Sequence, residues 1–173
     1  NEFTGTLPDA EGSGNYLAVY PAKSNLIGQV ASVDLRSQAA GGLNPNLTYM
    51  YAISADGKTF EFNHLTALLK PRFTGIPSEE TVSSVAISSD EPTYKDQDVM
   101  NNNTIKRAYD YNISFTALPT YIYLPSMGVG KKLVFIVATN KDIYTATLTT
   151  KKAIEAGKLY TTTIALEKSA RTD

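Results

Sequence analysis

The chain contains a single histidine, His64, and a Ser–His–Asp catalytic triad would have to use it. It stands between Phe62 and Leu65, the most apolar local context available. No G-x-S-x-G sequence leads into a helical pattern, so the usual setting of a nucleophilic serine is missing. One histidine also cannot supply the usual ligands of a zinc site. We interpret His64 as a packed or hydrogen-bonded structural residue and predict no catalytic residue.

Four acidic residues, Asp90, Glu91, Asp96 and Asp98, lie close together in the sequence. Oxygen ligands at this density could hold a calcium ion, but their spacing lacks the glycine and the regular positions of an EF-hand loop. Paired carboxylates could also hydrolyse glycosides. No tryptophan and no motif that combines aromatic and acidic residues supports that chemistry. We interpret the cluster as a solvated acidic loop and predict no metal and no cofactor.

Two other patterns suggest ligand binding. Gly128 and Gly130 resemble a phosphate-binding loop only superficially, because a strand pattern and not a helix follows, and we predict a hairpin turn. Six of the tyrosines form three close pairs that could stack on carbohydrate, although core packing with the hydroxyl at the rim is the simpler interpretation. These tyrosines are Tyr16, Tyr20, Tyr49, Tyr51, Tyr121 and Tyr123.

The bulk composition excludes several classes of protein. Lysine and arginine number 16 and aspartate and glutamate 17, which gives a net charge of −1, and a nucleic-acid-binding protein would need a basic stripe. No polybasic cluster suits an anionic membrane surface. The absence of cysteine excludes disulfides, thiolate metal sites and cysteine nucleophiles. At 173 residues, the chain is long enough for one good core or two small ones.

The strongest structural pattern lies between residues 131 and 168. Residues 133–137 are a continuous apolar run, which predicts a buried central strand. Residues 144–149 and 160–166 alternate between apolar or aromatic residues and threonine or alanine, which predicts half-exposed neighbouring strands. Between them, Gly157 suggests the end of a single helical turn at 152–156. This part of the chain is scaffold and carries no chemistry.

The rest of the chain also has a β pattern. We predict strands at 3–7, 16–20, 29–35, 49–53, 81–88, 112–117 and 120–124, and a hairpin that turns at Asp56–Gly57 and continues through 59–62. Residues 63–72 fit either a helix or a buried strand. Residues 90–110 contain few large apolar side chains and are predicted to form a long surface loop, with at most a short strand near Ile105. Many short strands and almost no helix predict an antiparallel sandwich.

The order of several segments resembles the fimbrillin-like family of Bacteroides-type bacteria, whose members are type V pilus subunits and related surface lipoproteins. No single segment is specific, but their order and spacing along nearly the whole chain are. The segments are FTG at 3–5, NYLAVYPA at 15–22, YMYAIS at 49–54, FEFNHLTALLKPRF at 60–73, VSSVAISS at 82–89, YIYLP at 121–125, KLVFIVATNKDIYTATL at 132–148 and AGKLYTTTIAL at 156–166.

The resemblance implies transthyretin-like β-sandwiches and a non-enzymatic role at the cell surface. Family members are exported as lipoproteins and are trimmed by a protease that removes an N-terminal strand, and the open groove accepts a strand from the next subunit. Such β-augmentation satisfies the N–H and C=O groups of an open strand edge. The resemblance also favours a strand for the ambiguous residues 63–72. This chain is shorter than a typical two-sandwich subunit and stops soon after the last predicted strand.

We therefore interpret the chain as an all-β fimbrial subunit or adhesin. Its expected parts are an N-terminal β portion (residues 1–62) and a C-terminal sandwich (63–173). The expected partners are other pilus subunits, through strand exchange at an edge opened near the N-terminus, and a host protein or glycan receptor; nucleic acid is not expected. The expected location is the cell surface, associated with the outer membrane through a removed, lipid-anchored N-terminal segment. The alternatives are a surface module that binds a glycan or host protein and a hydrolase that uses the loop carboxylates.

Overall fold

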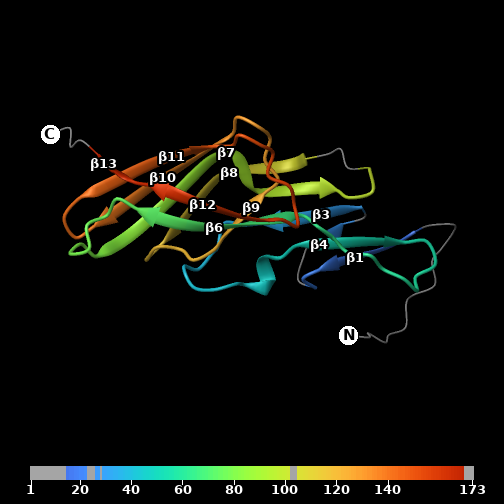
Figure 1. The fold of residues 1–173 in the computed structure, drawn as a ribbon. Coiled ribbons are helices and arrows are strands. Elements are labelled where there is room, and N and C mark those ends of the chain that lie inside the picture. Colours follow the sequence, from blue (N-terminus) through green and yellow to red (C-terminus); the bar gives the residue numbers. More distant parts are fainter. Residues whose placement is uncertain (1–14, 23–25, 28, 102–104, 170–173) are drawn as a thin grey trace.

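The computed structural model describes residues 15–22, 26–27, 29–101 and 105–169. Over these residues the chain forms thirteen β-strands in three sheets and one short 3₁₀ helix, η1 (Pro45–Leu47) (Figure 1). The predicted all-β sandwich class is thereby confirmed, whereas the transthyretin-like topology stays a prediction. The strand predicted at 3–7 lies outside the described residues. Among the described residues, no helix has the length and apolar character needed to cross a membrane.

The largest sheet has the strand order β13-β11-β10-β7-β3-β2, and β8 also pairs with β7. The long strand β7 therefore organises the molecule. One of its edges pairs with β10 and then with β3, and the other pairs with β8. The strands of this sheet are β2 (Leu26–Ile27), β3 (Val30–Asp34), β7 (Val82–Asp98), β8 (Ile105–Phe115), β10 (Lys132–Thr139), β11 (Ile143–Thr149) and β13 (Glu167–Lys168).

Two three-stranded sheets complete the fold. The first has the order β12-β6-β9 and consists of β6 (Thr66–Thr74), β9 (Ile122–Pro125) and β12 (Leu159–Ala165). The second has the order β1-β4-β5 and consists of β1 (Tyr16–Tyr20), β4 (Met50–Ser54) and β5 (Asn63–His64). In Figure 1, β6 and β12 form a layer beside the layer of β10 and β11. Among the described strands, β12 and β6 pair in parallel, and the other pairings are antiparallel. The predicted sandwich was antiparallel, and this one pairing departs from that prediction.

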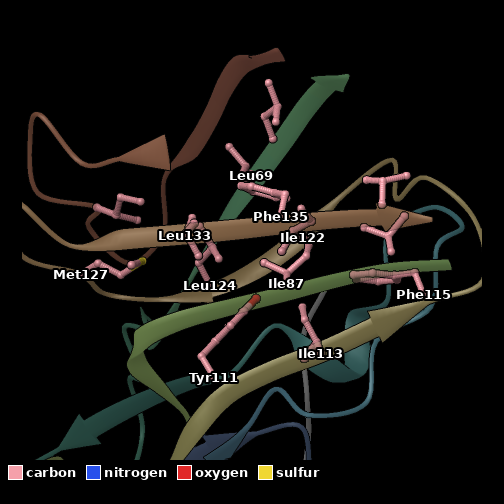
Figure 2. Close-up of a cluster of buried hydrophobic side chains, with 14 of the residues drawn as sticks. Leu69, Ile87, Tyr111, Ile113, Phe115, Ile122, Leu124, Met127, Leu133 and Phe135 are labelled. Atoms are coloured by element: carbon pink, nitrogen blue, oxygen red, sulfur yellow. The ribbon is translucent and has the colours of Figure 1, made fainter. Parts of the chain in front are cut away.

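The main core fills the space between the two layers. Buried side chains of β6, β7, β8, β9 and β10 meet there, among them Tyr111, Phe135 and Leu133 (Figure 2). The Tyr111 hydroxyl donates to the Tyr123 carbonyl at 3.0 Å, so this buried polar group is satisfied. A second, smaller cluster includes Val33 and Leu65 and contains residues from both predicted parts of the chain. The division at residue 62 stays a prediction.

The apolar run at 133–137 forms the central strand β10, but the expectation that both faces are buried is wrong. Leu133, Phe135 and Val137 are buried, whereas Ile136 on the opposite face is 45% exposed. The sandwich covers only one face of the large sheet at this strand. A strand buried on one face usually alternates between apolar and polar residues, and a strand buried on both faces is apolar throughout. Because Ile136 is apolar although exposed, the sequence of this strand resembles one that is buried on both faces.

Residues 90–110 are not the predicted surface loop. Residues 90–98 continue β7, and β8 begins at Ile105, so the two strands form a long hairpin. The pairing passes through three irregularities: the two between Ser89 and Tyr94 accommodate extra residues in β7, and the one between Lys95 and Gln97 accommodates an extra residue in β8. Because the polar side chains here find partners on neighbouring strands, low β-propensity does not prevent the strand from forming.

Three smaller expectations are corrected as well. Residues 59–62 are not a strand: β4 pairs with β1 and with β5 instead, although Gly57 does form a turn, at φ +67°. Residues 152–156 are not helical, because Ile154 forms an isolated β-bridge with Met127. The turn at Gly128 and Gly130 leads from β9 to β10 in another sheet and is therefore not a hairpin turn. Residues 63–72 form β5 and most of β6, as the strand interpretation predicted.

Candidate functional site

An open edge of the sandwich is the most distinctive feature of the structure. In the large sheet, one edge of β11 pairs with β10 over the whole length of β11. On its other edge, within the described residues, Tyr144 and Thr145 pair with the short strand β13, and the Ile143 carbonyl accepts from Ser169 N–H just after it. Opposite, β12 pairs with β6, and within the described residues no strand pairs with its second edge. Two strand edges with free pairing capacity therefore lie at the same side of the sandwich.

A hollow of about 470 Å³ opens between these two edges, and we call it the β11–β12 slot. Ala146 and Leu148 are half-buried in it and pack against the main core. Ile164 is buried, whereas Thr147, Thr163 and Ala165 are exposed. The full lining comprises Thr145, Ala146, Thr147, Leu148, Thr163, Ile164, Ala165 and Glu167. The slot thus offers backbone edges together with a mixed apolar and hydroxyl-bearing surface.

One end of the slot is held closed by polar contacts around β13. Ser169 N–H donates to the Ile143 carbonyl at 2.8 Å, and Lys168 Nζ lies 2.7 Å from Asp142 Oδ2. Beside them, the Tyr144 hydroxyl donates to Glu80 Oε1 at 2.9 Å. Burial and this carboxylate raise the pKa of Tyr144 to about 12, so the hydroxyl stays protonated as a donor through neutral pH. The Ser169 and Lys168 contacts hold β13 at one end of β11, and no other described strand pairs with the rest of this edge.

We expect an edge to be opened near the N-terminus, and the described strand nearest to that end is β1. Its residues Tyr16–Tyr20 pair with β4, and the described residues supply no second neighbour for it. Because residues 1–14 lie outside the described part, this edge stays a prediction. The β11–β12 slot, which sequence reasoning did not identify, is a place within the described residues where two strand edges border one hollow. No local signal reveals it, since it depends on which strands become neighbours.

His64 lies on β5 and is exposed, so its apolar sequence neighbours do not bury it. Its ring approaches the backbone of Gly157, where an added Cβ would come within 3.1 Å of the imidazole. In the part of the chain described by the structure, no serine or aspartate side chain hydrogen-bonds to it. The structure therefore places His64 against a turn, without the partners of a catalytic triad.

The four acidic residues lie along β7 and have separate partners. Asp90 accepts from Lys132 N–H at 3.0 Å, Glu91 lies 3.4 Å from Lys131 Nζ, and Asp98 accepts from the Met100 and Asn101 N–H groups. Asp96 is buried, and it accepts hydrogen bonds from Ser32 and Tyr94. Among the described residues, no group of three or more His, Cys, Asp or Glu side chains could hold a metal ion.

A buried lysine also lies on this strand. Lys95 is opposite Val33 of β3, and cross-strand neighbours point to the same face of a sheet, here the face of the second buried cluster. Its side chain is 9% exposed, and burial lowers the pKa of its ammonium group, while the Glu91 carboxylate opposes this shift. A charged group taken out of water in this way reduces stability.

We expect Lys95→Met to raise the free energy of unfolding by about 1–3 kcal/mol at pH 7, because methionine keeps the aliphatic packing and removes the buried charge. The folded pKa of Lys95 lies below its unfolded value. The cost of the charge therefore falls as pH rises toward the unfolded pKa, and the advantage of the variant should shrink with it. Urea unfolding at pH 7 and 10 measures both effects. Lys151→Met, at an exposed position, is the control, and an equal gain from it would contradict the burial argument.

The tyrosine pairs do not form one exposed patch. Tyr49 and Tyr51 pack against the second buried cluster, and Tyr49 donates to the Asp34 carbonyl at 3.1 Å. Tyr123 belongs to that cluster, and its hydroxyl accepts from Asn44 N–H at 3.0 Å. Tyr121 lies under Lys70 Nζ, 5.9 Å from the ring centroid. For Tyr49, Tyr51 and Tyr123, the simpler interpretation of core packing therefore describes the structure, and the hydroxyls of Tyr49 and Tyr123 are hydrogen-bonded.

An exposed aromatic group does exist, at residues that sequence reasoning missed. The Arg36 guanidinium lies over Tyr94 and Tyr109, with its central carbon 5.1 and 5.2 Å from the two ring centroids. The two rings meet edge to face at 5.4 Å. Tyr109 is 51% exposed. The alternation of Tyr109, Tyr111 and Ile113 is the sequence signal that would have placed this residue on a strand.

The fold defines an all-β sandwich with an open edge, and comparison with solved structures finds that fold elsewhere. A candidate cell adhesion protein of Bacteroides ovatus aligns with a TM-score of 0.56 and 17% identity, over 98% of this chain and 73% of its own. A candidate cell adhesion protein of Bacteroides uniformis aligns with a TM-score of 0.55 and 20% identity, over 91% of this chain and 70% of its own. At these identities the likeness establishes the fold. No sequence model of a protein family and no curated protein matches the chain.

Proposed function

We propose that this protein is a non-enzymatic cell-surface adhesion protein of the fimbrillin-like kind, which joins to its neighbours by strand addition in the β11–β12 slot. The observation that carries the proposal is the slot itself, where, among the described residues, the β11 edge is paired at one end alone, the outer β12 edge has no strand partner, and Ala146 and Leu148 are half-buried. The fold shared with two candidate adhesion proteins of Bacteroides supports it. The same likeness in fold supports a location on the outer surface of the cell, as part of a fimbrium associated with the outer membrane.

The physics of the slot favours a strand as its occupant. An added strand would satisfy the N–H and C=O groups of the β12 edge, which runs for seven residues from Leu159 to Ala165. Its alternate side chains would cover Ala146 and Leu148 and remove apolar surface from water. Because threonine lines much of the slot, the strand should alternate between apolar and hydrogen-bonding side chains. Unpaired edges that nothing covers are otherwise a route to uncontrolled association.

Substitutions that place a charge in the slot test the proposal. We expect the wild-type protein, released from its native cells, to give a heat-sensitive ladder of oligomers on an unheated SDS gel. Leu148→Asp and Ala165→Asp should give a single monomer band, because an inserted strand would bury the new carboxylate. Ser84→Asp is the control, since Ser84 is exposed on β7 and lies outside both the β12 edge and the slot lining.

Thermal unfolding of each purified variant checks that the monomer still folds. Ala165 is exposed, so Ala165→Asp should keep the wild-type melting temperature even if Leu148→Asp does not. A ladder that persists in a folded Ala165→Asp variant, or a wild-type protein that is only monomeric, would contradict strand addition in the slot.

A module that binds a glycan or a host protein is the alternative function. The observation that favours it is the exposed Tyr109 beside Arg36, which borders a hollow other than the slot. An exposed aromatic ring with a planar donor group next to it is a common feature of recognition surfaces. Both functions are compatible in one protein, because they use different faces.

A further inference from the structure

The outer face of the large sheet carries a second hollow, of about 310 Å³. The strand register arranges its lining in rows. Ser114 of β8, Ala86 of β7 and Ile136 of β10 are direct neighbours across three strands, and Asn112 and Ser88 form the next row. Ala86, Asn112, Ser114 and Ile136 are exposed, and Ser88 is half-buried.

Arg36 borders this hollow and is held in a fixed position. Its Nε and Nη2 donate to the two oxygens of Asp34 at 2.9 and 2.7 Å, and its guanidinium lies over the rings of Tyr94 and Tyr109. Within the described part of the chain, Nη1 makes no hydrogen bond. A guanidinium that is held by a bidentate pair and by two rings loses little freedom when it donates to a ligand.

The chemistry of this surface suits a neutral saccharide. The Asp34 carboxylate balances the Arg36 charge, so the surface offers hydrogen-bond donors and acceptors without net charge to attract an acid. The amide of Asn112 and the hydroxyls of Ser88 and Ser114 can both donate and accept, as sugar hydroxyls require. Ile136 and the exposed part of Tyr109 provide apolar surface for the C–H faces of a sugar ring.

We propose that the outer face formed by Arg36, Ala86, Ser88, Asn112, Ser114 and Ile136 is a binding site for neutral saccharides. The inference deepens the alternative function proposed above and rests on it, and it is independent of strand addition. The hollow takes one sugar residue on Ile136, with Arg36 Nη1 and the Asn112 amide donating to its hydroxyls, and a second residue of the same chain reaches Tyr109. Few polar groups at fixed positions around an apolar floor are the usual composition of small-molecule sites.

An array of neutral hexose and N-acetylhexosamine oligosaccharides, with sialylated and sulfated ones beside them, tests the proposal on the whole chain. The expected result is binding of neutral oligosaccharides. Titration calorimetry with the neutral oligosaccharide that gives the strongest signal should then show at least tenfold weaker binding by Asn112→Ala and by Arg36→Ala. Ala86→Trp, which fills the hollow, should abolish binding. Ser84→Ala, at an exposed position on the same face of β7 outside the lining, should bind as wild type.

Three results would overturn the proposal: no binding of any oligosaccharide, binding of acidic ones alone, or binding that folded Asn112→Ala and Ala86→Trp variants retain. Melting temperatures identify the variants that remain folded. Ala165→Asp, which blocks the slot, should bind the same oligosaccharide as wild type. Failure of strand addition and failure of saccharide binding therefore give different results.

Discussion

Replacing Phe135 with alanine is expected to lower the free energy of unfolding by about 3–5 kcal/mol. Phe135 is fully buried on the central strand β10, directly between Ile87 of β7 and Ala146 of β11. Its ring meets Phe73 of the opposite layer edge to face, with the centroids 5.9 Å apart. Alanine removes this contact between the layers and leaves a cavity that the surrounding strands cannot close. Since small proteins are typically stable by about 5–15 kcal/mol, the loss is a large part of the total.

Urea unfolding followed by circular dichroism measures this loss. Ile136→Ala is the matched control, because it removes an apolar side chain from the next residue of the same strand, and that side chain is 45% exposed. We expect the control to cost less than about 1 kcal/mol. Equal losses in the two variants would mean that β10 is buried on both faces, as its sequence suggested, and would contradict the one-sided sandwich.

How far the sequence predicts the fold depends on where the side chains find their partners. Alternation at 144–149 and 160–166 reports the packing of each strand on the main core, and both predicted strands are present as β11 and β12. The same alternation would suit a parallel or an antiparallel neighbour. The residues of β12 alone therefore could not predict its parallel pairing with β6. For the same reason they could not predict the slot that this pairing leaves beside β11.

Residues 90–110 show the opposite case, in which local composition misleads. Aspartate, asparagine and proline are disfavoured in strands because they usually bond to nearby backbone or lack a donor. Here Asp96 instead accepts from Ser32, 64 residues away, and Asp98 accepts from the backbone of the turn that follows β7. These long-range and turn contacts make the hairpin of β7 and β8 stable. The register of this hairpin also sets Tyr109 opposite Tyr94 and beside Arg36, an arrangement that a surface loop at 90–110 would not predict.

Gly75→Ala is expected to destabilise the protein by about 2 kcal/mol or more and to disturb the slot as well. Gly75 follows β6 at φ +96°, a conformation that costs an L-residue about 1–3 kcal/mol. In addition, a Cβ at this position would lie 2.1 Å from the Leu166 carbonyl oxygen. Leu166 N–H donates to the Thr74 carbonyl at 2.8 Å, so the end of β6 and the end of β12 are held together there. The added methyl group must push these two chain segments apart.

The consequence for the slot follows from chain order. Leu166 lies between β12 and β13, and β13 closes one end of the slot by pairing with β11. Displacing Leu166 should loosen β13, so Gly75→Ala is expected to weaken the oligomer ladder as well as the monomer. Gly128→Ala is the control, because nothing lies within 4 Å of an added Cβ there. Urea unfolding and the unheated gel, run on both variants, separate the effects. If Gly75→Ala behaved like Gly128→Ala in both, β6 and β12 would not approach each other at Gly75 as described.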